Sequence, residues 1–192
     1  MRVLIAGVIG GIVMFLWGAV AHMALPLGEI GIRQPANENV VLSTLHEGLG
    51  AEPGVYMLPS LAPDKMSDPA AVKTYADKAK ASPYAWVVYL PQGEDLTQMG
   101  RQLQRQWASD TLAALALAFL MGWAGLGFRR RLAIAGVAAL FAWLSVLAPY
   151  WNWYRFPLDL SLSALVEQVV GWLLAGAAMG WWIGRREPRR TF

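Results

Sequence analysis

Four long apolar runs constrain the fold of this chain more than any other feature, since about 20 consecutive apolar residues can cross the hydrocarbon core of a bilayer as a helix. The runs cover residues 3–25, 111–128, 132–150 and 162–183. Hydrophobic residues make up 56% of the chain and charged residues 15%, a balance too apolar for a soluble domain. We therefore predict an all-α membrane protein with four transmembrane helices, the last three within residues 107–184.

The first run has a second interpretation. Arg2 precedes it, and Ala19, Val20 and Ala21 form a small-residue pattern of the kind at which signal peptides are cleaved. The run is longer than the apolar core of a usual signal peptide, which favours a retained helix. Cleavage after Ala21 would leave three spans with the same orientation of the carboxyl terminus.

The basic residues indicate the orientation of the spans. They gather beside the apolar runs, at Arg2, at 129–131 and in a basic tail over 185–192. Positive charge in short flanking segments marks the cytoplasmic face of a bacterial inner membrane, so both termini are expected in the cytoplasm and residues 28–106 in the periplasm. Because these residues form no basic stripe on a polar surface, the net charge of +3 does not indicate nucleic-acid binding.

Residues 28–106 are polar and punctuated by prolines, and they are expected to form a small α/β extracytoplasmic domain between the first two spans. The expected elements are a helix over 40–49, a strand over 54–58, a helix over 69–81 and a strand over 84–90. Asp68 can cap the second of these helices, with Pro69 at its first position. Asp95 is expected to cap a further helix that begins at Leu96 and continues into the second span. Two strands form a weak sheet, so this domain should lean on the membrane helices or on a partner.

Short connections and small residues predict how the spans pack. The arginines at 129–131 leave only a short turn between the second and third spans, which should therefore be antiparallel neighbours. Gly7 and Gly11 on the first span, and Gly176 and Gly180 on the fourth, provide surfaces on which another helix backbone can approach closely. The simplest interpretation pairs the first span with the fourth, and a contact with another protein is the alternative.

His22 and Glu167 form the candidate ligand-binding site. Both lie toward the outer ends of their spans, at depths where the two side chains could touch. Such a pair could handle protons or bind a ligand, and the alternative is a structural pair near the headgroup region.

Aromatic and charged residues extend this candidate site along the outer boundary. Trp151 and Trp153 are typical of an aromatic belt at the membrane surface. Arg155 and Asp159 are expected to form a local ion pair. Together with these tryptophans, a set of polar residues expected at the outer membrane surface could bind a lipid headgroup or dock a partner domain. The set is Glu29, Arg33, Asp110, Asn152, Arg155 and Asp159.

The search for an enzyme active site gives a negative result. The chain has no cysteine, which excludes disulfides, thiolate metal ligands and cysteine nucleophiles. It contains no phosphate-binding glycine loop, zinc-binding histidine pair, nucleophile elbow or acidic calcium loop. We therefore predict no catalytic residue, metal ion or cofactor, and the sequence favours a non-catalytic role without excluding an unusual enzyme.

Three functions fit these observations. The leading hypothesis is a non-catalytic accessory or assembly subunit of a larger inner-membrane complex of respiration, photosynthesis, secretion or transport, with other integral membrane subunits and membrane lipids as partners. The alternative is a lipid- or quinone-binding membrane protein that uses an outer-leaflet site near His22 and Glu167. An envelope sensor is a third hypothesis, which the short cytoplasmic segments disfavour.

Overall fold

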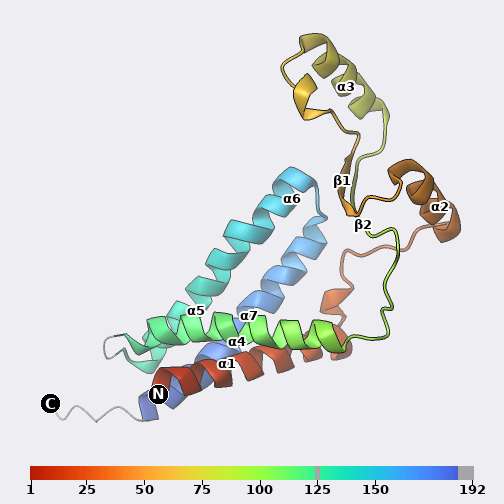
Figure 1. Cartoon of the computed structure of the whole chain (residues 1–192). Coiled ribbons are helices and arrows are strands. Elements are labelled where there is room, and N and C mark those ends of the chain that lie inside the picture. Colours follow the sequence, from red (N-terminus) through yellow and green to blue (C-terminus); the bar gives the residue numbers. More distant parts are fainter. Residues whose placement is uncertain (124–125, 186–192) are drawn as a thin grey trace. The chain divides into compact units, whose positions relative to one another are not determined.

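The computed structural model describes residues 1–123 and 126–185 and is mostly helical (Figure 1). The chain divides into two compact units, each described here by itself. One comprises Met1–Arg33 and the chain from Thr97 onward, and the other comprises Gln34–Leu96.

The larger unit is helical throughout. Its elements are α1 (Arg2–Ala19) with a π-helical turn (Val20–Ala24), α4 (Gly100–Gly122), α5 (Phe128–Ala142) with a π-helical turn (Trp143–Leu147), α6 (Ala148–Tyr154) and α7 (Leu158–Arg185). Among the described residues, three continuous helical segments are long and apolar enough to cross a membrane. They are Arg2–Ala24, Phe128–Tyr154 and Leu158–Arg185, with 23, 27 and 28 residues. These segments indicate a membrane-embedded protein.

The break between the second and third predicted spans lies earlier than expected. α4 ends at Gly122, and α5 begins at Phe128 with Gly127 before it, so the arginines at 129–131 belong to the first turn of α5. Glycine is a poor helix former whereas arginine is a good one, which explains why the chain breaks at the glycines. The basic tail predicted over 185–192 lies outside the described residues, apart from Arg185.

Two other predicted boundaries are wrong. Asp95 does not cap a helix at Leu96, because the chain turns again before α4 begins at Gly100. The runs at 132–150 and 162–183 leave residues 151–161 as an expected loop, which is shorter in the structure, since α6 runs to Tyr154 and α7 begins at Leu158. Pro157 favours this early start, because its fixed φ suits a helix amino terminus, and its carbonyl oxygen accepts a hydrogen bond from the Ser161 amide at 3.1 Å.

Packing in the larger unit corrects the expected hairpin. α1 lies along α4 and also packs against α7, and α5 packs along α7 with few contacts to α4 (Figure 1). The prediction that the second and third spans are close antiparallel neighbours is therefore wrong over most of their length. A short connection keeps the joined ends of two helices close together. It does not determine how the remaining turns pack, because this depends on which helix surfaces are complementary.

The glycines show which surfaces fit. A Cβ atom on Gly7 or Gly11 would lie 2.8 Å from the Cα of Leu115 or 2.6 Å from the Cα of Thr111, both on α4. Gly176 instead faces Ala135 of α5. The two predicted glycine surfaces thus contact α4 and α5 rather than each other.

α1 does contact α7, but through different glycines. A Cβ on Gly10 would lie 2.5 Å from the sulfur of Met179, and one on Gly171 would lie 2.6 Å from the Trp17 indole. At each contact a glycine of one helix faces a large side chain of the other helix. Because glycine has no side chain, the two helices can approach closely.

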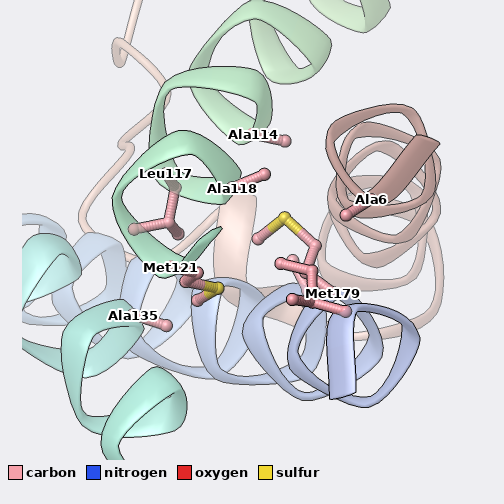
Figure 2. Packing of buried hydrophobic residues seen from close by; sticks show 9 residues of the cluster. Ala6, Ala114, Leu117, Ala118, Met121, Ala135 and Met179 are labelled. Atoms are coloured by element: carbon pink, nitrogen blue, oxygen red, sulfur yellow. The ribbon is translucent and has the colours of Figure 1, made fainter. Parts of the chain in front are cut away.

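Alanine and methionine fill the core of this unit (Figure 2). Ala6, Ala114, Ala118 and Ala135 are fully buried and allow close approach, and the flexible Met179 fills the gap between helices. Four helices meet in this cluster, so it sets their separation.

The smaller unit contains the predicted elements in the predicted order. They are α2 (Glu38–Leu49), β1 (Gly54–Leu58), α3 (Pro69–Ala81) and β2 (Ala85–Tyr89). The Asp68 carboxylate caps α3 by accepting a hydrogen bond from the Ala70 amide at 2.9 Å. β1 and β2 pair antiparallel, with Val55 opposite Val88, and both of these valines are exposed.

Candidate functional site

The structure places His22 and Glu167 in contact. The Nε2 atom of His22 lies 3.1 Å from Oε1 of Glu167, although the residues are 145 positions apart. His22 belongs to the π-helical turn after α1, and Glu167 to the third turn of α7. The His22 side chain is 54% exposed and that of Glu167 is 20% exposed, so the pair extends from the surface into the helix bundle.

The backbone around Glu167 is also fixed. The indole Nε1 of Trp17 donates a hydrogen bond to the carbonyl oxygen of Glu167 at 2.9 Å. Trp17 lies on α1 and His22 lies in the π-helical turn after it. This stretch of chain therefore makes two polar contacts with Glu167 of α7. These contacts hold the Glu167 carboxylate against the imidazole.

Asp110 adds a second carboxyl group, from α4. It is buried, and the Gln106 amide donates a hydrogen bond to it at 2.9 Å. Asp110 precedes the apolar part of α4 and belongs to none of the three spanning segments. Burial raises the pKa of the Asp110 carboxyl group, the hydrogen bond from Gln106 partly lowers it, and the nearby charge of Glu167 raises it.

A short strap, defined here as residues 25–33, crosses this site. Gly28 lies directly against the imidazole of His22, where a Cβ atom would collide with Nδ1. Gly31 has a φ of +85°, and a Cβ there would lie 2.6 Å from Cβ of Leu160. The guanidinium of Arg33 then binds the Asp159 carboxylate at 3.2 Å. The strap therefore packs against His22 and forms an ion pair with the start of α7.

This ion pair corrects the expected pairing of Arg155 with Asp159. Asp159 binds Arg33, and one of its oxygens also accepts a hydrogen bond from the Leu160 amide at 2.9 Å. Arg155 lies in the turn after α6, and its side chain is exposed. The partner of Asp159 is 126 positions away, so local spacing could not reveal it.

The other predicted site residues do not join the His22–Glu167 contact. Trp151 and Trp153 lie on α6 with exposed indole rings. Within the described ranges, neither they nor Arg155 form a hydrogen bond or ion pair with His22 or Glu167. The predicted site residues thus lie in three separate places. His22 contacts Glu167, Asp159 pairs with Arg33, and Trp151, Trp153 and Arg155 lie in or beside the exposed turn after α6.

Sequence reasoning did not predict that two polar residues are buried. Asp110 was expected among the polar residues at the outer membrane surface, and its spacing of one turn from Gln106 was an available signal of the hydrogen bond between them. Arg131 was expected only as a boundary charge, but it is 1% exposed and donates hydrogen bonds to the carbonyl oxygens of Met121 and Gly180 at 3.3 and 3.5 Å. It therefore binds carbonyl groups near the carboxyl ends of α4 and α7.

The arrangement brings titratable groups from three helices together. The imidazole of His22 and the carboxylate of Glu167 are in contact, and Asp110 is close enough to Glu167 to interact with it electrostatically. These groups can offer a donor and acceptors to a polar ligand group. No group of three histidines or acidic residues among the described residues is placed to hold a metal ion.

Comparisons with models of protein families, with curated proteins and with solved structures give no match to this chain.

Proposed function

We propose that the chain is a non-catalytic accessory or assembly subunit of a larger bacterial inner-membrane complex. The observation that carries this proposal is the open surface of the spanning segment Phe128–Tyr154. Val137, Phe141 and Leu144 follow one face of it and are 68%, 71% and 53% exposed. This segment packs along α7, which leaves the opposite face available to a helix of another subunit.

A groove beside this face is suited to such a helix. It has a volume of about 440 Å³, and it is lined by Gly136, Leu140, Leu165, Val166, Val169 and Val170. The lining is apolar and comes from both α5 and α7. A Cβ at Gly136 would lie 3.5 Å from the Leu173 side chain of α7, so the glycine leaves room along this seam for a second helix. Membrane helices associate through this kind of tight packing, because burial of apolar surface gives no advantage over lipid.

The experiment is purification of the native complex in mild detergent, with Gly136→Leu and Gly18→Leu as matched variants. A Cβ at Gly18 meets nothing within 4 Å, so Gly18→Leu controls for the added side chain. We expect wild type and Gly18→Leu to co-purify with a stoichiometric membrane partner that Gly136→Leu loses. A stable monomer without a partner would argue against the proposal.

The proposed topology has four crossings, with the apolar part of α4 as the second. Both termini then lie in the cytoplasm and Gln34–Leu96 in the periplasm, which places the arginines of α5 inside. A cysteine introduced at Ser67 should react with an impermeant thiol reagent added to intact spheroplasts, and one at Thr191 should not. Labelling of the cysteine at position 191 would show that the orientation is the reverse of the proposed one. Sequencing of the mature amino terminus tests cleavage after Ala21.

A second function is favoured by the contact of His22 with Glu167. We propose as the alternative a lipid- or quinone-binding protein in which this pair, beside the buried Asp110, binds a polar headgroup. Native mass spectrometry of wild type should then show a retained lipid or quinone that the His22→Ala, Glu167→Gln double variant loses. Equal retention by both proteins would remove this alternative.

A further inference from the structure

Arg155 occupies a backbone conformation that disfavours its side chain. Its φ and ψ are 59° and 27°, and it follows the last residue of α6. The amide groups of Arg155 and Phe156 both donate to the carbonyl oxygen of Tyr150, so this left-handed turn ends the helix. Glycine or asparagine usually occupies such a position, because other side chains are strained there.

The side chain of Arg155 does not compensate for this strain through contacts within the protein. It is exposed, and it makes no hydrogen bond or ion pair with any of residues 1–123 or 126–185. The nearest acidic residue along the chain, Asp159, is already bound to Arg33. Residues in such strained conformations cluster at functional sites, including those that bind ligands.

The surroundings of Arg155 indicate what it binds. It comes directly after one spanning segment, which ends at Tyr154, and just before another, which begins at Leu158. In the proposed topology, on which this inference rests, the turn lies at the boundary between hydrocarbon and water. The ring of Tyr150 packs against Tyr154 and Phe156, with centroids 5.4 Å apart in each case, so aromatic rings pack beside the turn.

We propose that Arg155 binds the phosphate group of an anionic phospholipid in the leaflet next to the turn between α6 and α7. A guanidinium can donate two parallel hydrogen bonds to phosphate oxygens. The exposed indoles of Trp151 and Trp153, at 45% and 74% exposure, supply the amphipathic surface that settles at headgroup level beside it. This site is separate from the His22–Glu167 contact and requires no partner subunit.

The experiment is native mass spectrometry of the full chain in detergent with added phosphatidylglycerol. Arg155→Gln removes the charge, Arg155→Lys keeps it without the planar fork, and Arg101→Gln removes an exposed charge at the start of α4. We expect Arg155→Gln to retain about fivefold less phosphatidylglycerol than wild type, the effect of one basic residue at a membrane surface. Arg155→Lys should be intermediate, and Arg101→Gln should match wild type.

Two outcomes would overturn the proposal. Equal phosphatidylglycerol retention by wild type and Arg155→Gln, including no retention by either, would show that Arg155 is not the site. Complete displacement of the lipid by inorganic phosphate, with the same dependence on Arg155, would show that free phosphate rather than a phospholipid is the ligand. Folding is checked independently, because each variant must give the size-exclusion profile of wild type before its lipid content is compared.

Discussion

His22 and Glu167 meet at 3.1 Å across the interface between α1 and α7. The contact brings a carboxylate from α7 close enough to Asp110 of α4 for the two acidic groups to interact. Residues of three helical segments therefore contribute to one polar site, and its charge depends on which groups hold protons.

The first prediction concerns Asp110 and pH. Its pKa is raised from 3.8 in the folded protein, so the stability that the protonated group contributes is present at low pH and lost as pH rises through the folded value. Asp110→Asn keeps the shape without the charge. We expect its melting temperature to exceed that of wild type at neutral pH and to match wild type at about pH 4. Asp64→Asn, at an exposed acid, is the control and should show no such pH-dependent gain.

The second prediction concerns two glycines of the same helix. Gly11→Ala would place a Cβ 2.6 Å from the Cα of Thr111, where backbone must move, so we expect a loss of about 1–3 kcal/mol in the free energy of unfolding. Gly18→Ala meets nothing within 4 Å and should be neutral or stabilising by up to about 1 kcal/mol. Unfolding titrations in detergent measure both. Equal effects of the two substitutions would show that α1 does not pack on α4 at Gly11.

The third prediction concerns the buried arginine. Arg131→Gln loses donors to the carbonyl oxygens of Met121 and Gly180, and we expect it to lower the free energy of unfolding by about 3 kcal/mol. Arg130→Gln, at the exposed neighbour, should change it by no more than about 0.5 kcal/mol. Unfolding titrations in detergent compare the two variants. Similar losses in the free energy of unfolding would contradict the stabilising hydrogen bonds assigned to the buried Arg131.

The fourth prediction concerns the strained turn. Arg155→Gly removes a side chain from a backbone with φ of 59°, and relief of that strain should raise the melting temperature, with a gain of about 1 kcal/mol. Arg155→Ala removes the guanidinium as well but keeps a Cβ, so it should not be stabilising. A melting temperature of Arg155→Gly at or below that of Arg155→Ala would contradict the assigned backbone conformation.

Local signals in the sequence predicted the smaller unit well. Asp68 and Pro69 define the start of α3, and short apolar runs rich in valine and aromatic residues define β1 and β2, because capping and strand patterns depend on residues that are close along the chain. The apolar runs similarly located three spanning segments, whereas the predicted second span, in α4, is not among them. The contact of His22 with Glu167 could be anticipated from their similar depth in the membrane.

Helix packing could not be predicted in the same way. The spans are apolar on all sides, so periodicity does not show which face of α7 meets α1 and which meets α5. The choice depends on pairs such as Gly10 with Met179 and Gly176 with Ala135, which only the three-dimensional fit reveals. The burial of Arg131 and the pairing of Arg33 with Asp159 depend on the same fit.

The π-helical turn at Val20–Ala24 has a consequence for how this protein can change through insertion and deletion. A π turn holds one residue more than an α turn, so residues beyond it are rotated by about 100° relative to an uninterrupted helix. Loss of one residue here would restore the regular ladder without interrupting the span. It would also move the imidazole away from Glu167 and redirect the strap that follows. The helix can therefore survive a change of length at this point, whereas the polar site cannot.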